Sequence, residues 1–281
     1  MDRQLGDVVF VGQYQAERMI DTWSARNNFP HFMLIVGENG SGRKSLSYLI
    51  AKALGAQVYT ISDVSVESCR NLIRVAYTVN SKIVYLIPDA DNMSAAARNS
   101  LLKLTEEPPE FAYVIMTLNS LDNTLPTLRS RSQHIRIEPY SVDELKQLSN
   151  DDLMPQVAKT PGMLKLLESM GQNNVNSFIS TCEKIVMYID KVTTANALKS
   201  SNSIKFKESD KGYDLNLMIA GIEHVLQSKM SYPQFIMRLS CWYKVISKYR
   251  IQFNRAGVNK RAVYDQLIFD IRKSLRERGA I

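Results

Sequence analysis

Short apolar runs divide the first half of the chain, and stretches with helical spacing separate them. The strand candidates are residues 32–36, 83–87, 112–118 and 134–137. Helical spacing of apolar residues follows at 46–54 and 94–105. Strands of a parallel sheet read as continuous apolar runs because helices cover both faces of the sheet. The pattern therefore predicts an α/β module built on a parallel sheet.

From residue 141 onward the pattern predicts helices only. Ser141 and Glu144 have the spacing of a capping box that starts one helix, and another helix is expected from residue 160 to about 170. A segment rich in Ser, Lys and Asp, residues 198–214, is predicted to be a linker or an exposed loop. Helical periodicity returns from about Leu215 to the end, where Trp242, Tyr243 and Tyr249 are typical of a helical core.

A degenerate phosphate-binding loop follows the first apolar run. In the form G-x-x-x-x-G-K-[ST], backbone N–H groups wrap the phosphates, the lysine reaches the β and γ phosphates, and the hydroxyl holds Mg²⁺. Here Arg43 stands at the lysine position, and a frame moved by one residue puts Arg43 where the last glycine must be. The candidate binding residues are Gly37, Gly40, Gly42, Arg43, Lys44 and Ser45.

Pro88-Asp89 follows the second apolar run. At these two positions, ATPases with a phosphate-binding loop of this kind place an Asp that holds Mg²⁺ and a Glu that orients the attacking water. Proline offers no metal ligand, and Asp89 is one methylene shorter than Glu, so its reach is wrong for polarising water. We predict no metal site and no certain cofactor. Because a helix N-terminus attracts anions, Arg43 and Lys44 leave open that ATP or ADP binds without turnover.

Several further motifs give the chain a specific resemblance. They are Val11-Gly12-Gln13, Pro30-His31, Asp89-Ala90-Asp91, residues 99–109 with Leu-Leu-Lys-x-x-Glu-Glu-Pro-Pro, and residues 125–133 with Pro-Thr-x-x-Ser-Arg-Ser. Over about residues 8–170 the chain resembles AAA+ clamp-loader subunits, most closely the delta-prime type of DNA polymerase III in bacteria or a viral relative. The resemblance implies an AAA+ module over residues 1–140, a helical lid over 141–200 and a helical collar over 201–281.

The resemblance also implies a division of labour. Arg131 would be an arginine finger that acts in trans on the ATP site of a neighbouring subunit, although a structural ion pair is the alternative for this residue. Met163 stands where a lid arginine would contact the γ-phosphate, while Thr117 or Asn119 remains a candidate first sensor. The expected function is a non-hydrolysing, stator-like subunit of a clamp loader in DNA replication. The implied partners are other clamp-loader subunits, a sliding clamp and primer-template DNA, with no membrane.

Charge and composition agree with a soluble globular protein. Net charge is +7, and residues 182–281 carry 18 basic and 9 acidic side chains, which suggests a polyanionic partner or a merely solvated basic face. No apolar run is long enough to span a membrane and no secretory signal is evident, so we expect a bacterial cytoplasm or the cytoplasm of a virus-infected host. The cysteines, too far apart for a zinc module, are expected to be reduced packing residues: Cys69, Cys182 and Cys241.

Two other functions remain open from the sequence. One is an active ATPase that uses Lys44 and Ser45 in a rearranged loop, with Asp89 or Asp91 as metal ligand. The other is a free-standing DNA-binding scaffold related to clamp loaders. ATP turnover by the isolated protein would favour the first, and absence of sister ATPase subunits would favour the second.

Overall fold

The computed structural model describes residues 3–5, 8–189, 191–205, 213–230, 232–253 and 258–277. The chain forms two compact units. The first consists of Met1–Leu148 together with Thr160–Gly162, and the second of Ser149–Lys159 together with Met163–Ile281. Within the described ranges, no helix is both long and apolar enough to cross a membrane.

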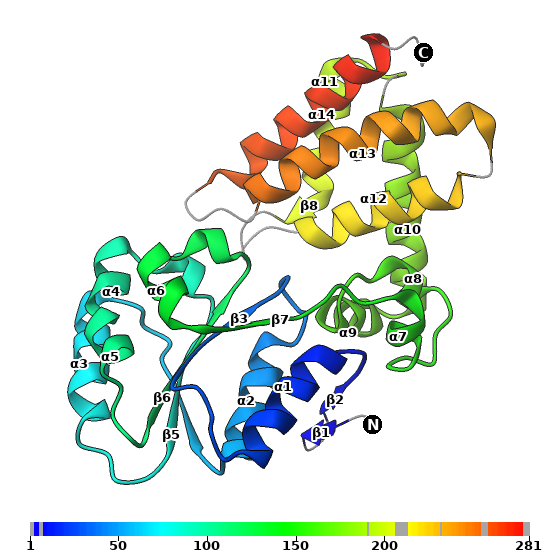
Figure 1. Ribbon diagram of the computed structural model, residues 1–281. Coiled ribbons are helices and arrows are strands. Elements are labelled where there is room, and N and C mark those ends of the chain that lie inside the picture. Colours follow the sequence, from blue (N-terminus) through cyan, green and yellow to red (C-terminus); the bar gives the residue numbers. More distant parts are fainter. Residues whose placement is uncertain are drawn as a thin grey trace. The chain divides into compact units, whose positions relative to one another are not determined.

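The first unit is built on a five-stranded parallel sheet (Figure 1). The strands, in the order in which they lie side by side, are β4 (Gln57–Thr60), β5 (Ile83–Ile87), β6 (Ala112–Leu118), β3 (Phe32–Val36) and β7 (Gln133–Arg136). Val36 at the end of β3 pairs with Leu118 of β6 and Arg136 of β7. Because parallel strands end at the same edge, the loops that follow β3, β5 and β6 gather there.

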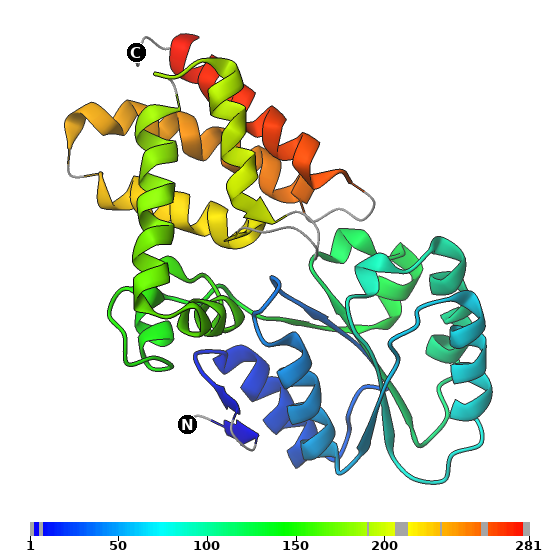
Figure 2. The ribbon, with the colours of Figure 1, turned by 180° about the vertical axis from the view of Figure 1, so that it is seen from behind.

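Helices cover both faces of this sheet (Figures 1 and 2). On one face lie α1 (Tyr14–Ala25) and α2 (Arg43–Leu54). On the other lie α3 (Val66–Ala76), α4 (Ala95–Ser100), α5 (Leu102–Glu106) and α6 (Pro126–Arg131). Alternate residues of β3 enter the two cores, with Leu34 in one and Met33 and Ile35 in the other. The predicted parallel α/β fold is confirmed.

Several short elements complete the first unit. They are β1 (Arg3–Leu5), β2 (Val8–Phe10), the 3₁₀ turns η1 (Ala90–Asn92) and η2 (Leu121–Asn123), and α7 (Val142–Lys146). The predicted capping box is present at α7, since the Ser141 hydroxyl accepts from the Glu144 N–H and the Glu144 carboxylate accepts from the Ser141 N–H. The helix expected over 94–105 is two short helices, α4 and α5, on either side of Leu101.

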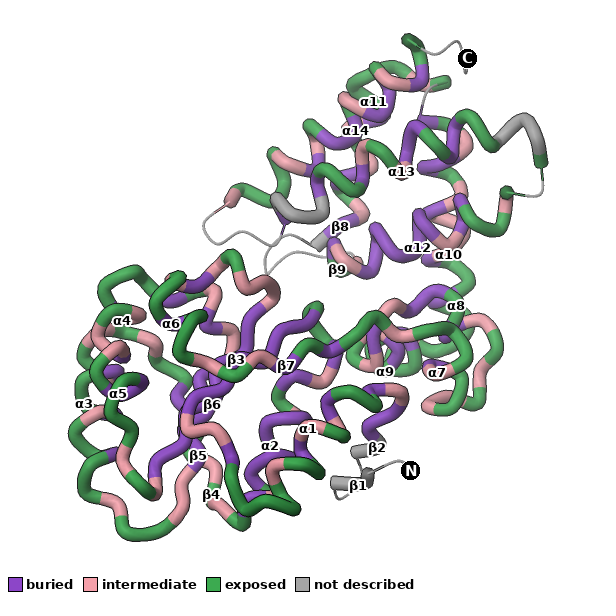
Figure 3. The backbone as a smooth tube through the Cα atoms, in the orientation of Figure 1, coloured by how far each residue is buried: buried purple, intermediate pink, exposed green. Residues whose placement is uncertain are grey.

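The second unit is mainly helical. Its helices are α8 (Met154–Val157), α9 (Pro161–Met170, which starts in the first unit), α10 (Gln172–Tyr188), α11 (Thr194–Leu198), η3 (Lys199–Ser203), α12 (Leu215–Ser228), α13 (Pro233–Phe253) and α14 (Lys260–Glu277). Phe178, Trp242 and Tyr264 are fully buried in its core, which the purple segments in Figure 3 trace. Of the three aromatic residues predicted to lie in this core, Trp242 and Tyr249 are buried, whereas Tyr243 is half-buried. All three cysteines of the chain are buried and unpaired.

The prediction of helices only beyond residue 141 is wrong at one place. The strand β8 (Ile204–Lys205) pairs in parallel with β9 (Tyr213–Asp214). Two residues are too few to show the alternation by which a strand is recognised. The predicted loop 198–214 thus contains η3 and both strands, and its residues 206–212 lie outside the described residues. The subdivision of the helical region into a lid and a collar at residue 200 stays a prediction.

Candidate functional site

The phosphate-loop segment, residues 37–42, connects β3 to α2 at the carboxyl edge of the sheet. Gly42 is the N-cap of α2 with φ 98°, and Gly40 has φ 80°. Residues with a Cβ rarely adopt this left-handed conformation, so these two glycines are required by the path of the backbone. The strand, loop and helix that a phosphate loop needs are therefore all present.

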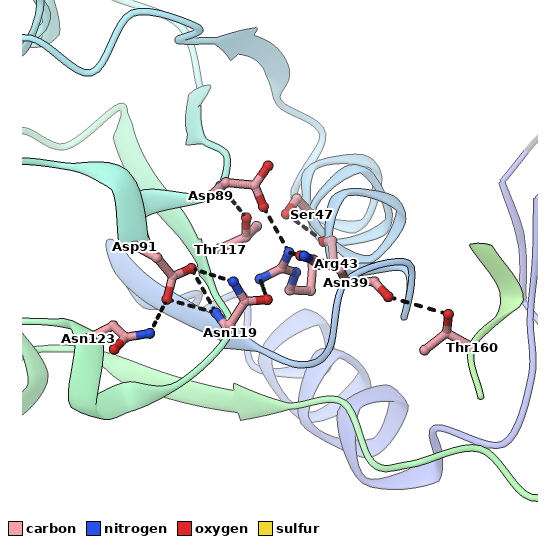
Figure 4. Close-up of polar contacts among 9 residues, drawn as sticks. All are labelled: Asn39, Arg43, Ser47, Asp89, Asp91, Thr117, Asn119, Asn123 and Thr160. Atoms are coloured by element: carbon pink, nitrogen blue, oxygen red, sulfur yellow. Dashed lines mark hydrogen bonds and ion pairs between the residues drawn. The ribbon is translucent and has the colours of Figure 1, made fainter. Parts of the chain in front are cut away.

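Arg43, the first residue of α2, fills the centre of this site with its own guanidinium (Figure 4). Its side chain is 7% exposed. Nη1 donates to Asn119 Oδ1 at 3.1 Å, while Nη2 donates to Asn39 Oδ1 at 2.6 Å and to Asp89 Oδ1 at 2.8 Å. Burial lowers the pKa of Arg43, and the negative charges of Asp89 and Asp91 oppose that shift. One cation thus ties together the loop and the ends of β5 and β6.

The two possible frames of the loop are distinguished by which side chain points inward. Arg43 is buried against Asp89, whereas Lys44 is exposed and Ser45 is half-buried. Of the two basic residues, Arg43 is therefore the one that faces the ends of β5 and β6. Its planar guanidinium differs from the compact ammonium of lysine, and here it is engaged by oxygen atoms of its own chain.

Asp89 supplies the carboxylate of the ion pair. Its φ of 49° is unusual for a residue with a side chain, and its N–H donates to Thr117 Oγ1 at 2.9 Å. Pro88, immediately before it, has no side-chain ligand to offer. Within the described part of the chain, no group of three or more His, Cys, Asp or Glu side chains could hold a metal ion.

A second carboxylate, Asp91, organises the neighbouring turn. It accepts hydrogen bonds from the backbone N–H of Asn119 at 2.8 Å and from Asn123 Nδ2 at 2.7 Å. Asn119 therefore lies between Arg43 and Asp91, whereas Thr117, the other candidate sensor, bonds the backbone of Asp89. The network extends from the loop to η2, which precedes α6 (Figure 4).

The outer side of the loop is held by the segment Thr160–Gly162. The N–H of Gly162 donates to the Gly40 carbonyl at 2.9 Å, and Thr160 Oγ1 donates to the Asn39 carbonyl at 3.3 Å. A Cβ added at Gly162 would lie 2.7 Å from the Gly40 Cα, so the two backbones are in direct contact. The loop is therefore fixed by groups of this chain.

Arg131, the predicted finger, is the last residue of α6, and its side chain is 37% exposed. Nη2 pairs with Glu106 Oε1 at 2.8 Å, and Nη1 donates to the Thr127 carbonyl at 3.0 Å. The alternative ion pair is thus present in the structure. A guanidinium has five N–H donors, so these contacts leave donors for a second group, and a role toward a neighbouring subunit stays a prediction.

Several contributors were not identified from the sequence, among them Asn39, Glu106, Asn123 and Tyr140. Asn39 occupies a loop position that the motif leaves unspecified, and Glu106 belongs to a motif that gives no sign of its partner. The Tyr140 hydroxyl donates to the carbonyl of Ser41, 99 positions away in the chain, at 2.9 Å. Burial raises the pKa of Tyr140 to about 12, so the hydroxyl stays protonated at neutral pH.

Comparisons of sequence point to replication proteins. The model of a family described as DNA polymerase III, delta subunit, matches residues 66–141. DNA polymerase III subunit delta′ of Bacillus subtilis is 25% identical over 185 residues, which are 53% of this chain and 53% of the relative. DNA polymerase III subunit gamma of Buchnera aphidicola subsp. Schizaphis graminum is 26% identical over 165 residues, which are 48% of this chain and 46% of the relative. The chain thus spans about half the length of these curated relatives.

Comparison of structures supports the fold. A gamma subunit-related protein of DNA polymerase III from Thermotoga maritima has a TM-score of 0.54 at 16% sequence identity. The match covers 92% of this chain and 99% of that protein's chain. The RuvB Holliday junction branch migration motor of the same organism has a TM-score of 0.52 at 15% identity, covering 96% and 89%. By its parallel sheet, its motifs and these relatives, the chain is similar to the AAA+ subunits of DNA polymerase III clamp loaders.

Proposed function

We propose that this chain is a non-hydrolysing, delta-prime-type subunit of a sliding-clamp loader that supplies Arg131 to the ATP site of a neighbouring subunit during DNA replication. The motifs around residues 99–109 and 125–133 and the names of the relatives support the assignment. Because those relatives are matched over part of their length, the activity and the partners are our own proposal.

The observation that carries the proposal is the ion pair between Arg43 and Asp89. Phosphoryl transfer needs a cation that is free to meet the β and γ phosphates, together with carboxylates that hold Mg²⁺ and orient water. In this chain the cation and the carboxylate neutralise each other at 2.8 Å. Arg43 cannot turn to a phosphate without giving up this contact, whereas Asp89 has a second oxygen, Oδ2, outside it.

Nucleotide bound without turnover is a weaker form of the same proposal. A phosphate of ATP or ADP would have to replace the Asp89 carboxylate as the partner of Arg43, and the loop would have to keep its contact with Gly162. The helix N-terminus at Gly42 favours an anion in either case.

Arg131 supports the other half of the proposal. A guanidinium delivered from a neighbouring molecule neutralises charge on the transferred phosphoryl group, and such fingers accelerate GTPases by ~10³–10⁵. Arg131 lies at the end of a helix and is partly exposed, as a group that reaches a neighbour must be.

The remaining parts of the proposal concern assembly. Residues 141–200 would act as a lid and 201–281 as a collar that joins the chain to other clamp-loader subunits, around a sliding clamp and primer-template DNA. Contacts to DNA phosphates would be independent of sequence and weakened by salt.

ATP hydrolysis by the purified chain, alone and after reconstitution with its sister ATPase subunits, tests the proposal. We expect no turnover by the chain alone and full activity in the assembly. Lys44→Ala is the control, because Lys44 is exposed and does not contact Asp89. Turnover by the isolated chain that Lys44→Ala abolishes would establish the active ATPase instead, and failure to assemble with any ATPase subunit would favour the scaffold.

A further inference from the structure

An ion pair joins the end of α5 to the end of α6. Glu106 is the last residue of α5 and Arg131 is the last residue of α6, and Oε1 of the first lies 2.8 Å from Nη2 of the second. The two sequence motifs that carry the resemblance, residues 99–109 and 125–133, are therefore joined in space by these two side chains.

Both helix ends are fixed by the same hydrophobic core. Leu104, two residues before Glu106, and Leu128, three residues before Arg131, are fully buried in one cluster. The backbone positions of the pair are thus set by packing, which changes little with the state of the surface. What remains free is the direction of the long arginine side chain.

The contacts of Arg131 constrain that direction from two sides. The Thr127 carbonyl accepts from Nη1 at 3.0 Å and Glu106 accepts from Nη2. A planar guanidinium held at two nitrogens has a defined orientation, while its other N–H donors stay available. The side chain is still 37% exposed, and that of Glu106 is 49% exposed.

We infer that Glu106 is a positioning residue for Arg131, holding the guanidinium in the orientation in which it is presented to the neighbouring subunit. This inference rests on the proposed function, since it needs Arg131 to act in trans. An unrestrained arginine loses its rotamer freedom on binding a phosphate, and a restrained one has already lost most of it. Glu106 therefore raises the rate of the neighbour's reaction without touching its nucleotide.

A surface ion pair that merely joins α5 to α6 would have a different signature. Its loss would lower stability slightly and leave ATP hydrolysis by the assembly unchanged. A positioning role predicts a lower kcat with an unchanged KM for ATP, because the contact matters in the transition state rather than in ground-state binding.

The test is steady-state ATP hydrolysis by the complete loader carrying substitutions in this chain. We expect Glu106→Ala to lower kcat about two- to fivefold, the range expected for loss of an exposed ion pair. Glu106→Gln should recover part of the loss, because it keeps an acceptor oxygen. Glu107→Ala is the matched control: it removes the adjacent carboxylate, whose side chain is exposed, and should change nothing.

A double substitution separates the inference from the proposed function. In an Arg131→Ala background, Glu106→Ala should have no further effect, because its action passes through Arg131. The positioning role would be overturned if Glu106→Ala caused an equal further loss in the Arg131→Ala background. It would also be overturned if Glu106→Ala alone left the rate of ATP hydrolysis unchanged or raised it. Each of these outcomes leaves the finger assignment intact. Full activity with Arg131→Ala would overturn the finger itself, and the positioning role with it.

Discussion

Two arginines of the first unit show how surroundings decide what a guanidinium can do. Arg43 is 7% exposed and donates to one carboxylate and two amide oxygens, all from its own chain. Arg131 is 37% exposed and meets one carboxylate and one carbonyl. The positive charge of Arg43 is compensated by groups inside the protein, whereas that of Arg131 remains accessible to solvent.

The difference follows from where each residue lies on its helix. Arg43 starts α2 at the carboxyl edge of the sheet, where the oxygen-bearing loops after β5 and β6 converge. Arg131 ends α6, and among the described residues the carboxylate that it meets comes from the end of α5. Both residues stand at helix ends, but Arg43 is held by three oxygen atoms at the converging edge, whereas Arg131 keeps N–H donors free.

The largest expected effect is on the hydrolysis of ATP by the assembled loader. Arg131→Ala should lower it by at least ~10²-fold if the guanidinium acts in trans, since fingers of this kind contribute ~10³–10⁵ in GTPases. Arg129→Ala is the matched control, because it removes an arginine of the same helix whose only ion pair in the described residues is with Asp122 at 3.7 Å. Equal activity of the two variants would contradict the assignment.

A smaller effect is expected on stability from the inner arginine. Arg43→Ala should lower the free energy of unfolding by about 1–3 kcal/mol, because Asp89 and two amide oxygens lose their donor. This loss of stability is smaller than the loss expected on breaking a fully buried ion pair, because the Asp89 side chain is 46% exposed and can be hydrated. Denaturant unfolding measures it, with Lys44→Ala expected within about 0.5 kcal/mol of the parent. A loss no larger than that of Lys44→Ala would show that the site is loosely held.

The smallest expected effect is the salt dependence of the free energy of unfolding, which distinguishes the two arginines. Arg131→Ala should change the free energy of unfolding by less than about 1 kcal/mol, and the change should shrink as salt rises, because exposed pairs are screened. The loss caused by Arg43→Ala should hardly depend on salt. Unfolding curves for both variants at low and high NaCl make the test, and a salt dependence equal in both would remove the distinction between an inner and an outer arginine.

The sheet could be predicted where burial leaves a simple pattern. The runs 32–36, 83–87 and 112–118 are buried on both faces and gave continuous apolar sequence. The edge strand β4 was missed, since its four residues are mostly exposed and carry no apolar run. The pair β8 and β9 was missed because each strand has only two residues.

Some residues of the candidate site were predictable from the sequence, but their contacts were not. Motif spacing identified Arg43, Asp89 and Arg131, because such positions are set along the chain. The partners came from other segments: Asn119 lies 76 positions from Arg43. Which of two adjacent basic residues points inward was likewise decided by the left-handed turn at Gly42, a property of the folded backbone.

The contact of Gly162 with Gly40 bears on how this chain could change over evolutionary time. A lysine at position 43 would keep a positive charge beside Asp89 without the fork geometry of arginine, and the main-chain bond from Gly162 to Gly40 would hold the loop in its present form. Any larger residue at 162 would collide with the backbone it now touches, 2.7 Å away. Position 162 is therefore constrained to glycine for as long as the loop keeps its present path.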